Sequence, residues 1–311
     1  MTRWVGVLLA LLLTAGCRAG GPAMAPPAGS VAPPSIPGAA GPPLALSVFG
    51  PGDPDAVIVG VHGYGDHAAS TFAAAARAWA RHGIRTYAYD QRGFGRNASR
   101  GRWPGAAVLI ADLAAVVGHV RRRHPGLPLV VVGHSMGGGV ALAAGPQLAA
   151  DGLVLAAPAI WGGSALNPLH RGLAWLAAAT VPDRRFSGEG FVEIRASDND
   201  RVLRALARDP LYLSPPSPRE MMGLVRVMDR AAEAAPRTAL PAMLLTGAHD
   251  EILPVAAVRR MFARLPGPRS SIHYSDGWHL VFRDRQAPRV WHDVAEWVLA
   301  RPPPVMTADS G

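Results

Sequence analysis

The sequence predicts an α/β fold in which helices flank a mostly parallel sheet and a helical cap insertion lies over one end of it. Short, continuously apolar segments such as DAVIVGVH (55–62) and LPLVVVGH (127–134) are typical of strands buried on both faces. Helical patterns separate these segments, as parallel pairing through right-handed crossovers requires. The alternation stops between Ala159 and about Pro241 and then resumes, which predicts the insertion.

The expected elements follow in order along the chain. Strands are expected at 55–62, 84–90, 127–134, 152–158, 242–250 and 270–277, and helices at 69–83, 106–124, 136–150, 255–266 and 287–301. The stretch at about 159–241 has no long valine-rich strand and carries apolar and aromatic residues among prolines. Because strands of one sheet flank it on both sides, we expect a helical cap and not a separate domain.

Composition excludes some classes of protein. The chain has 311 residues, of which 49% are hydrophobic, so most of it can form a buried core. The net charge is +9, but the arginines are scattered and do not cluster with aromatic residues, so we expect no nucleic-acid partner. RRRH at 121–124 is expected to be a solvated helix end, with attraction to an anionic membrane surface as the alternative.

Residues 1–17 are expected to be a signal peptide outside the fold. An early arginine precedes an apolar stretch from about Trp4 to Leu13, which is short for a bilayer span. The segment LTAGC resembles the lipobox of bacterial lipoproteins, with Thr14 where leucine is usual, and this implies lipidation of Cys17. We therefore expect a lipid-anchored protein of the bacterial cell envelope, facing the periplasm or exterior. Plain cleavage to a secreted or soluble periplasmic protein is the alternative.

The rest of the chain divides by composition. Residues 18–43 are rich in glycine, proline and alanine and are expected to form a semi-extended tether. The folded domain is expected at 44–301, and residues 302–311 are expected to be a tail. Cys17 is the only cysteine, so an internal disulfide is excluded.

A glycine-rich turn after the strand at 127–134 carries the first candidate for chemistry. GHSMG places Ser135 between a buried strand and a helix, which is the pattern of a nucleophile elbow. Gly133 and Gly137 are expected to allow close passage of neighbouring chain. A structural turn with an idle serine is the alternative.

A serine hydroxyl is a weak nucleophile, so a base must take its proton and a carboxylate must orient that base. Asp250 and His279 each follow a later strand, which predicts a triad with Ser135 as nucleophile, Asp250 as acid and His279 as base. The alternatives for the base are His249 and His273, and the alternative for the acid is Asp276.

Negative charge that develops on a carbonyl oxygen must be met by N–H donors. The amide of Met136, at the start of the helix after Ser135, is expected to supply one donor. HGYGDH follows the strand at 55–62 and is expected to present the amide of Tyr64 as the other, with His62 orienting the loop. A simple glycine turn is the alternative for this motif.

Five motifs occur in the order and spacing seen in the α/β-hydrolase superfamily. They are HGYGDH, YDQRGFGR, GHSMGG, TGAHDEILP and DGWHL. Over about Leu44 to Arg301 they most resemble the monoacylglycerol lipase and lysophospholipase branch, which is grouped with serine aminopeptidases of the S33 type. The resemblance implies an α/β-hydrolase fold, the same triad and the same oxyanion donors. It also implies that Asp90 and Arg92 brace loops. Tyr64 stands where a small residue is more usual, and the usual glutamate shortly after the histidine is absent.

Residues and resemblance together predict a serine ester hydrolase that works through an acyl-enzyme. The expected substrates are lipid-like carboxylic esters such as monoacylglycerol or lysophospholipid, and the expected partners are this substrate and the membrane. No cofactor, metal or obligate protein partner is expected. The insertion is expected to line the acyl-chain site with Trp161, Leu166, Trp175 and Met222. Packing of the insertion on the sheet is the alternative role for these four.

Other functions remain open at this point. A small-ester carboxylesterase is the first alternative. A serine aminopeptidase would need a carboxylate in the insertion, for which Glu189, Glu193 and Asp198 are candidates. An inactive binding lipoprotein is the alternative from a different class. An epoxide hydrolase or dehalogenase of this fold needs an aspartate where Ser135 stands, so both are disfavoured.

Overall fold

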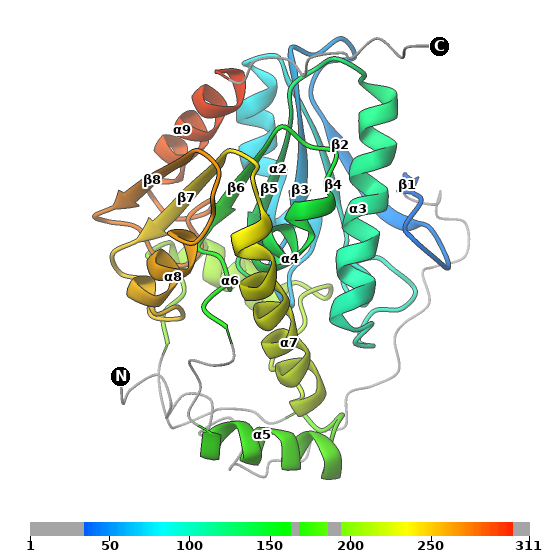
Figure 1. Ribbon diagram of the computed structural model, residues 1–311, viewed down its shortest axis with the longest axis vertical. Coiled ribbons are helices and arrows are strands. Elements are labelled where there is room, and N and C mark those ends of the chain that lie inside the picture. Colours follow the sequence, from blue (N-terminus) through cyan, green and yellow to red (C-terminus); the bar gives the residue numbers. More distant parts are fainter. Residues whose placement is uncertain (1–33, 163–167, 186–193, 301–311) are drawn as a thin grey trace.

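The computed structural model of the chain describes residues 34–162, 168–185 and 194–300. Within these ranges, eight strands form one sheet in the order β1-β2-β4-β3-β5-β6-β7-β8 (Figure 1). The strands are β1 Ser35–Ile36, β2 Leu44–Phe49, β3 Ala56–Val61, β4 Ile84–Tyr89, β5 Leu129–His134, β6 Gly152–Ala156, β7 Ala242–Gly247 and β8 Arg269–Tyr274. The β1–β2 and β2–β4 pairs are antiparallel, and the pairs from β4 to β8 are parallel.

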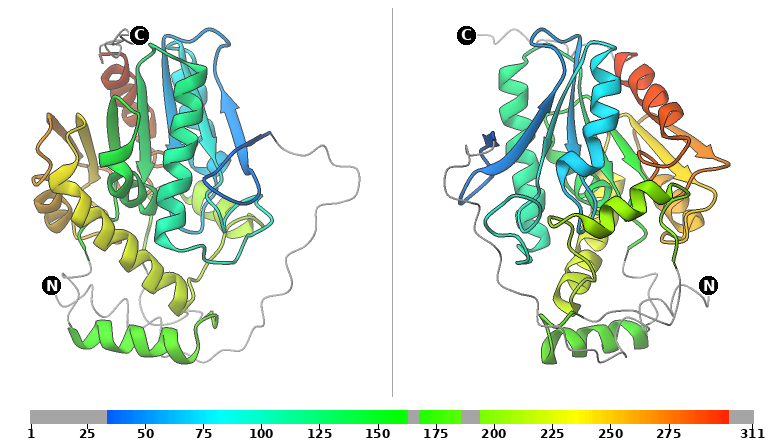
Figure 2. Two further views of the ribbon diagram at one scale, coloured as in Figure 1. Left: turned by 45° about the vertical axis from the view of Figure 1, so that its right-hand side comes forward. Right: turned by 180° about the vertical axis from the view of Figure 1, so that it is seen from behind.

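Helices cover both faces of the sheet (Figure 2). The helices are α2 Ala68–Ala80, α3 Ala106–Arg123, α4 Met136–Ala144, α5 Pro168–Thr180, α6 Asp200–Arg208, α7 Pro218–Ala234, α8 Val255–Phe262 and α9 Ala287–Leu299. Side chains of α2 and α9 pack on one face of the sheet, and side chains of α3, α4, α7 and α8 pack on the other. The predicted mostly parallel α/β sheet, flanked on both sides, is therefore confirmed.

The strand sequences explain this two-sided burial. In β3, Val57 and Val59 belong to the core on the α3 and α4 side, whereas Ile58 belongs to the core on the α2 and α9 side. All six residues of β3 are buried, and the same holds for β5. Alternate side chains of a strand point to opposite faces of the sheet. A strand that is covered on both faces therefore has apolar residues at successive positions and no alternation of apolar with polar residues. Continuous apolar runs in the sequence were the right signal for these strands.

The described part of the insertion after β6 is helical, as predicted. It contains α5, α6 and α7, and Figure 1 shows α5 beyond the carboxyl ends of the strands. The helix α7 starts with a capping box formed by Ser217 and Glu220. Its later residues Val227 and Ala231 enter the same core as Val140 of α4. The last helix of the insertion, α7, is thus packed into the body of the domain.

The folded domain begins before Leu44, which corrects the predicted tether at 18–43. Ser35 and Ile36 form β1 and pair with Ala45 and Leu44 of β2. The side chain of Ile36 is only 1% exposed. The error arose because glycine and proline around Ile36 give the segment the composition of a linker, whereas its burial and its pairing with β2 are tertiary contacts.

Among the helices of the described ranges, none has both the length and the apolar character that a bilayer span requires. Cys17 and the rest of the predicted signal peptide lie outside the described residues.

Candidate active site

The turn between β5 and α4 holds Ser135 in an unusual backbone conformation. Its φ is 53° and its ψ is −118°, a region that side-chain-bearing residues rarely adopt. The serine amide donates to the carbonyl of Ala156 at 3.0 Å. A Cβ on Gly137 would lie 2.1 Å from the carbonyl oxygen of Val61, and one on Gly133 would lie 2.5 Å from that of Gly137. The two glycines are therefore required by close passage of backbone, as predicted.

Ser135, His279 and Asp250 form a continuous hydrogen-bonded chain. The distance from Ser135 Oγ to His279 Nε2 is 3.0 Å, and that from His279 Nδ1 to Asp250 Oδ2 is 2.9 Å. A carboxylate can only accept, so Nδ1 carries the proton and Nε2 is free to accept from the serine hydroxyl. This is the tautomer that a general base for Ser135 requires.

The surroundings of Asp250 keep it charged and fixed. Its Oδ1 accepts from the amides of Ile252 and Leu253, both at 2.9 Å. Burial of Asp250 acts to raise its pKa, but His279 and these amide donors outweigh burial, so the pKa of Asp250 lies below its usual range. The side chains of Asp250 and His279 are nearly inaccessible to solvent.

The alternative bases and acid lie elsewhere. His249 is exposed and stacks on Trp278, with ring centroids 5.3 Å apart. His273 is on β8, where its Nδ1 lies 3.0 Å from the hydroxyl of Thr246. Asp276 is exposed. The structure thus brings His279 and Asp250 to Ser135 and leaves these three residues outside the hydrogen-bonded chain.

The HGYGDH segment (62–67), named here the oxyanion loop, passes directly beside Ser135. A Cβ on Gly63 would lie 3.2 Å from the Cβ of Ser135. His62 holds the loop through both ring nitrogens: Nδ1 lies 2.8 Å from the carbonyl of Gly63, and Nε2 accepts from the amide of Gln91 at 2.9 Å. Burial lowers the pKa of His62, which fits a neutral ring with one donor and one acceptor.

Met136 follows Ser135 directly in the chain, and Gly63, the residue before Tyr64, lies against the side chain of Ser135. Met136 is the first residue of α4, where the first N–H groups of a helix have no intrahelical acceptor. The amide of Tyr64 lies on the oxyanion loop one residue after Gly63. These are the two donors expected from the sequence.

The phenol of Tyr64 connects the oxyanion loop to the insertion. It donates to Glu220 Oε2 at 2.7 Å, and the same carboxylate accepts from Arg185 at 2.7 Å. Because Glu220 also caps α7 through the amide of Ser217, the start of α7 is tied to the loop. Burial is the main reason that the pKa of Tyr64 is raised, so the phenol stays a donor. The tyrosine in place of a small residue thus has a structural partner.

Asp90 and Arg92 brace segments around the site. Asp90 accepts from the amide of Ala68 and from Arg96. Arg92 donates to Asp112 at 2.8 Å and also reaches the carbonyl of Ala40. These contacts are those of loop supports.

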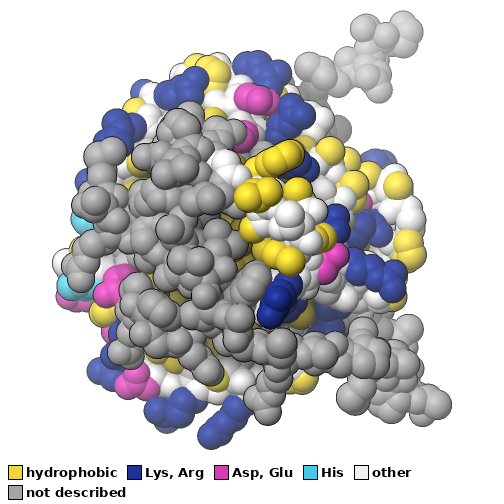
Figure 3. Space-filling view, turned by 90° about the horizontal axis from the view of Figure 1, so that it is seen from below, with side chains coloured by type: hydrophobic (Ala, Val, Ile, Leu, Met, Phe, Trp, Pro, Cys, Tyr) yellow, Lys and Arg dark blue, Asp and Glu magenta, His cyan; other side chains and the backbone are white. Residues whose placement is uncertain are grey.

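The four residues expected to line the acyl-chain site have different surroundings. Trp161 is partly buried and packs against the small cluster that Val225 and Met228 of α7 form with Ala159. Met222 is half-buried on α7. Trp175 on α5 is 62% exposed. The face of the molecule seen from below shows a group of hydrophobic side chains at the surface (Figure 3). Leu166 lies outside the described residues, as do Glu189 and Glu193.

Three further residues near the site were not singled out in the sequence. His134 donates from Nε2 to the carbonyl of His279 at 3.0 Å, and its burial lowers its pKa to about 3. Arg283 and Asp284 follow His279 by four and five residues and contact the oxyanion loop and the insertion, respectively. The available signal was the charged run FRDR, in the segment where the usual glutamate is missing.

The family model described as serine aminopeptidase, S33, matches residues 52–286. The chain is 29% identical over 256 residues to a monoacylglycerol lipase of Mycolicibacterium smegmatis, with 80% of this chain and 89% of the relative covered. It is 24% identical over 263 residues to a monoglyceride lipase of Rattus norvegicus, with 80% and 84% covered.

Solved structures show the same fold at lower identity. The monoacylglycerol lipase of Paleococcus ferrophilus gives a TM-score of 0.67 at 22% identity, over 82% of this chain and 98% of that one. A carboxyl esterase of Bacillus coagulans, solved in complex with glycerol, gives a TM-score of 0.69 at 19% identity, over 85% and 96%.

Proposed function

Because the chain belongs to the serine aminopeptidase S33 family and has the α/β-hydrolase fold, we propose that it is a serine ester hydrolase acting on monoacylglycerol-like esters. The observation that carries this proposal is the hydrogen-bonded chain from Ser135 Oγ through His279 to Asp250. The relatives described as monoacylglycerol and monoglyceride lipases support the choice of substrate.

In the proposed mechanism, His279 acts as base and acid in both half-reactions. His279 Nε2 takes the proton of the Ser135 hydroxyl as Oγ attacks the ester carbon, and Asp250 stabilises the imidazolium that forms. The oxygen that becomes negative is met by the amides of Tyr64 and Met136. His279 then gives its proton to the leaving alcohol, and the acyl group stays on Ser135. Water, deprotonated by the same histidine, releases the carboxylic acid and restores the serine.

The substrate is tested by a panel of hydrolysis rates. Purified protein is assayed with monoacylglycerols of different chain length, lysophospholipids, short p-nitrophenyl esters and aminoacyl amides, each also with the Ser135→Ala variant. The proposal predicts the highest kcat/KM for monoacylglycerols or lysophospholipids. Highest kcat/KM on the short esters would favour a carboxylesterase, and highest kcat/KM on the amides would favour an aminopeptidase. Either outcome would contradict the proposed substrate class.

We further propose that the protein is held at the bacterial cell envelope by a lipid on Cys17. The support is the resemblance of LTAGC to a lipobox and the short apolar segment before it. Mass spectrometry of the N-terminal peptide from the membrane fraction should find a diacylglyceryl modification on Cys17, and Cys17→Ala should release the protein from that fraction. An unmodified terminus would contradict the lipid anchor and favour a secreted or soluble periplasmic protein.

A further inference from the structure

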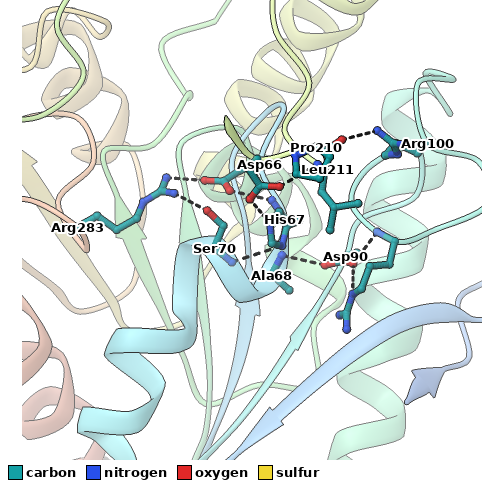
Figure 4. A network of polar contacts seen from close by, with 11 residues as sticks. Asp66, His67, Ala68, Ser70, Asp90, Arg100, Pro210, Leu211 and Arg283 are labelled. Atoms are coloured by element: carbon teal, nitrogen blue, oxygen red, sulfur yellow. Dashed lines mark hydrogen bonds and ion pairs between the residues drawn. The ribbon is translucent and has the colours of Figure 1, made fainter. Parts of the chain in front are cut away.

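A buried ion pair joins the oxyanion loop to the turn that carries His279 (Figure 4). Arg283 Nη2 donates to Asp66 Oδ2, and Arg283 Nη1 donates to the hydroxyl of Ser70 at 2.9 Å. The side chains are only 8% and 4% exposed for Arg283 and Asp66. Asp66 lies two residues after Tyr64, and Arg283 lies four residues after His279. One guanidinium therefore connects the segment of an oxyanion donor to the segment of the base.

Both partners are held firmly on their own segments. Asp66 uses its other oxygen, Oδ1, to accept from the amide of His67 at 2.9 Å. The carbonyl of Arg283 accepts from the side chain of Asn199 at 3.0 Å, and the amide of Leu280 donates to Ala196. The turn after His279 is thus packed against residues 196–199 of the insertion. Because Asp66 and Arg283 are each held by further hydrogen bonds, their ion pair keeps the oxyanion loop at a fixed distance from the turn after His279.

The charge state of the pair is secure at neutral pH. Burial of Asp66 acts to raise its pKa, but the Arg283 charge and further donors lower it to about 2. A buried ion pair costs desolvation, and an apolar pair of similar volume often gives equal stability. A gain in stability is therefore a weak explanation for a buried Arg283–Asp66 ion pair. The directed hydrogen bonds from Arg283 to Asp66 and Ser70, in contrast, fix the position of these residues relative to one another.

Catalysis requires that the oxyanion donors and His279 keep fixed positions relative to Ser135. An oxyanion donor stabilises the transition state only when it lies within about 3 Å of the developing charge, and His279 Nε2 must stay at its 3.0 Å from Ser135 Oγ. The oxyanion loop and the His279 turn reach Ser135 from different strands, β3 and β8. A displacement of about 1 Å between reacting groups costs on the order of 100-fold in rate.

We propose that Arg283 and Asp66 are positioning residues, whose ion pair sets the place of the oxyanion loop relative to His279. This inference rests on the proposed function. It predicts that loss of the pair lowers the rate of acyl transfer and leaves substrate binding in the ground state largely intact.

The test compares Arg283→Met with Arg283→Lys and with a matched control. Arg121 pairs with Asp151 at 2.6 Å, at the amino ends of β5 and β6 and away from the site, so Arg121→Met removes an ion pair without touching either loop. For each variant we would measure kcat and KM on a p-nitrophenyl ester, the rate of phosphonylation by a fluorophosphonate, and Tm. Arg283→Met should lose about 100-fold in kcat and in phosphonylation rate, with KM within about threefold. Arg283→Lys should regain at least tenfold, and Arg121→Met should keep kcat.

Hydrogen exchange of peptides covering residues 62–67 gives a readout that does not depend on a substrate. Exchange there should rise in Arg283→Met and stay unchanged in Arg121→Met. If Arg283→Met lowers Tm but keeps kcat within twofold and leaves exchange unchanged, the positioning role is wrong and the pair is only structural. Failure of the wild-type protein to react with any ester or fluorophosphonate would contradict the proposed function instead, and the exchange result would still decide the positioning role.

Discussion

At the scale of single residues, the activity of the site depends on the protonation state of Asp250 and on the tautomer of His279. Asp250 fixes the proton of His279 on Nδ1, because a carboxylate offers only acceptors. His134 holds the carbonyl of the same histidine from the other side. Together these contacts aim the unprotonated Nε2 at Ser135, so a change in either the charge or the tautomer should act on the rate and not on the fold.

Asp250→Asn separates the charge of this residue from its place in the loop. The amide keeps an oxygen that can accept from the amides of Ile252 and Leu253, so the loop should persist. Its NH₂ group would face His279 Nδ1 and favour the wrong tautomer. We expect kcat for ester hydrolysis to fall about 10⁴-fold with Tm close to that of the wild type. A variant that keeps more than a tenth of the wild-type kcat would contradict the role of Asp250.

The raised pKa of Asp284 predicts a pH dependence of the protein's stability. Burial raises its pKa from 3.8 to about 6, although Ser197 and the amide of Trp278 donate to it. Between these two values the folded state binds more protons at Asp284 than the unfolded state, so its contribution to the free energy of unfolding falls as pH rises from about 4 to 6. Asp284→Asn removes this titration. Urea denaturation at several pH values should show the stability of the variant, relative to wild type, rising across that window, and parallel curves would count against it.

At the scale of elements, the β5–α4 elbow has little room for added side-chain atoms. The helix α4 starts so close to β3 that its second residue, Gly137, has no room for a side chain. This closeness places the helix amino terminus, with its free N–H groups, beside the nucleophile. The same closeness makes the elbow sensitive to single methyl groups.

Two Gly→Ala variants measure that sensitivity. Gly137→Ala would place a Cβ 2.1 Å from the carbonyl oxygen of Val61, and we expect it to lower the free energy of unfolding by about 3 kcal/mol. Gly118→Ala in α3 meets only the flexible end of Arg122 at 3.5 Å, so we expect a gain of about 0.5 to 1 kcal/mol. Chemical denaturation measures both. Equal effects of the two substitutions would show that the elbow is not tightly packed.

The elements that the sequence predicted well share one property. Strands β3, β5, β6 and β7 are buried along their whole length, so their apolar runs are strong local signals. The carboxyl ends of β5 and β7 place Ser135 and Asp250 at one edge of the sheet. β1 was missed because its pairing with β2 is a tertiary contact that its two residues do not reveal. Arg283 was missed for the same reason, since its partner Asp66 is 217 positions away along the chain.

At the scale of the whole molecule, the segment before β2 is part of the fold. The amide of Ala39 donates to Asp112 at 2.8 Å, and Arg92 reaches the carbonyls of Ala40 and Pro42. The chain around Ile36 therefore covers the edge of the sheet and the flank of α3. The end of the predicted tether lies earlier than composition suggests.

Two truncated proteins test this boundary. A chain that starts at residue 34 keeps β1, whereas a chain that starts at residue 44 loses Ile36 and the two carbonyls, of Ala40 and Pro42, that accept from Arg92. We expect the shorter chain to be less stable than the longer one by about 2 to 5 kcal/mol, the range for deletion of one buried isoleucine side chain. Urea denaturation of the two proteins measures the difference. Identical midpoints of urea denaturation for the two proteins would show that the folded domain begins at Leu44.

In the proposed reaction, Ser135 attacks the substrate and carries the acyl group. This role is tested most directly by mass spectrometry of the protein after reaction with a fluorophosphonate, with the modified peptide mapped by fragmentation. We expect a single adduct, on Ser135, that is absent in the folded Ser135→Ala variant. An adduct that persists in Ser135→Ala, or no adduct on the folded wild-type protein, would contradict it.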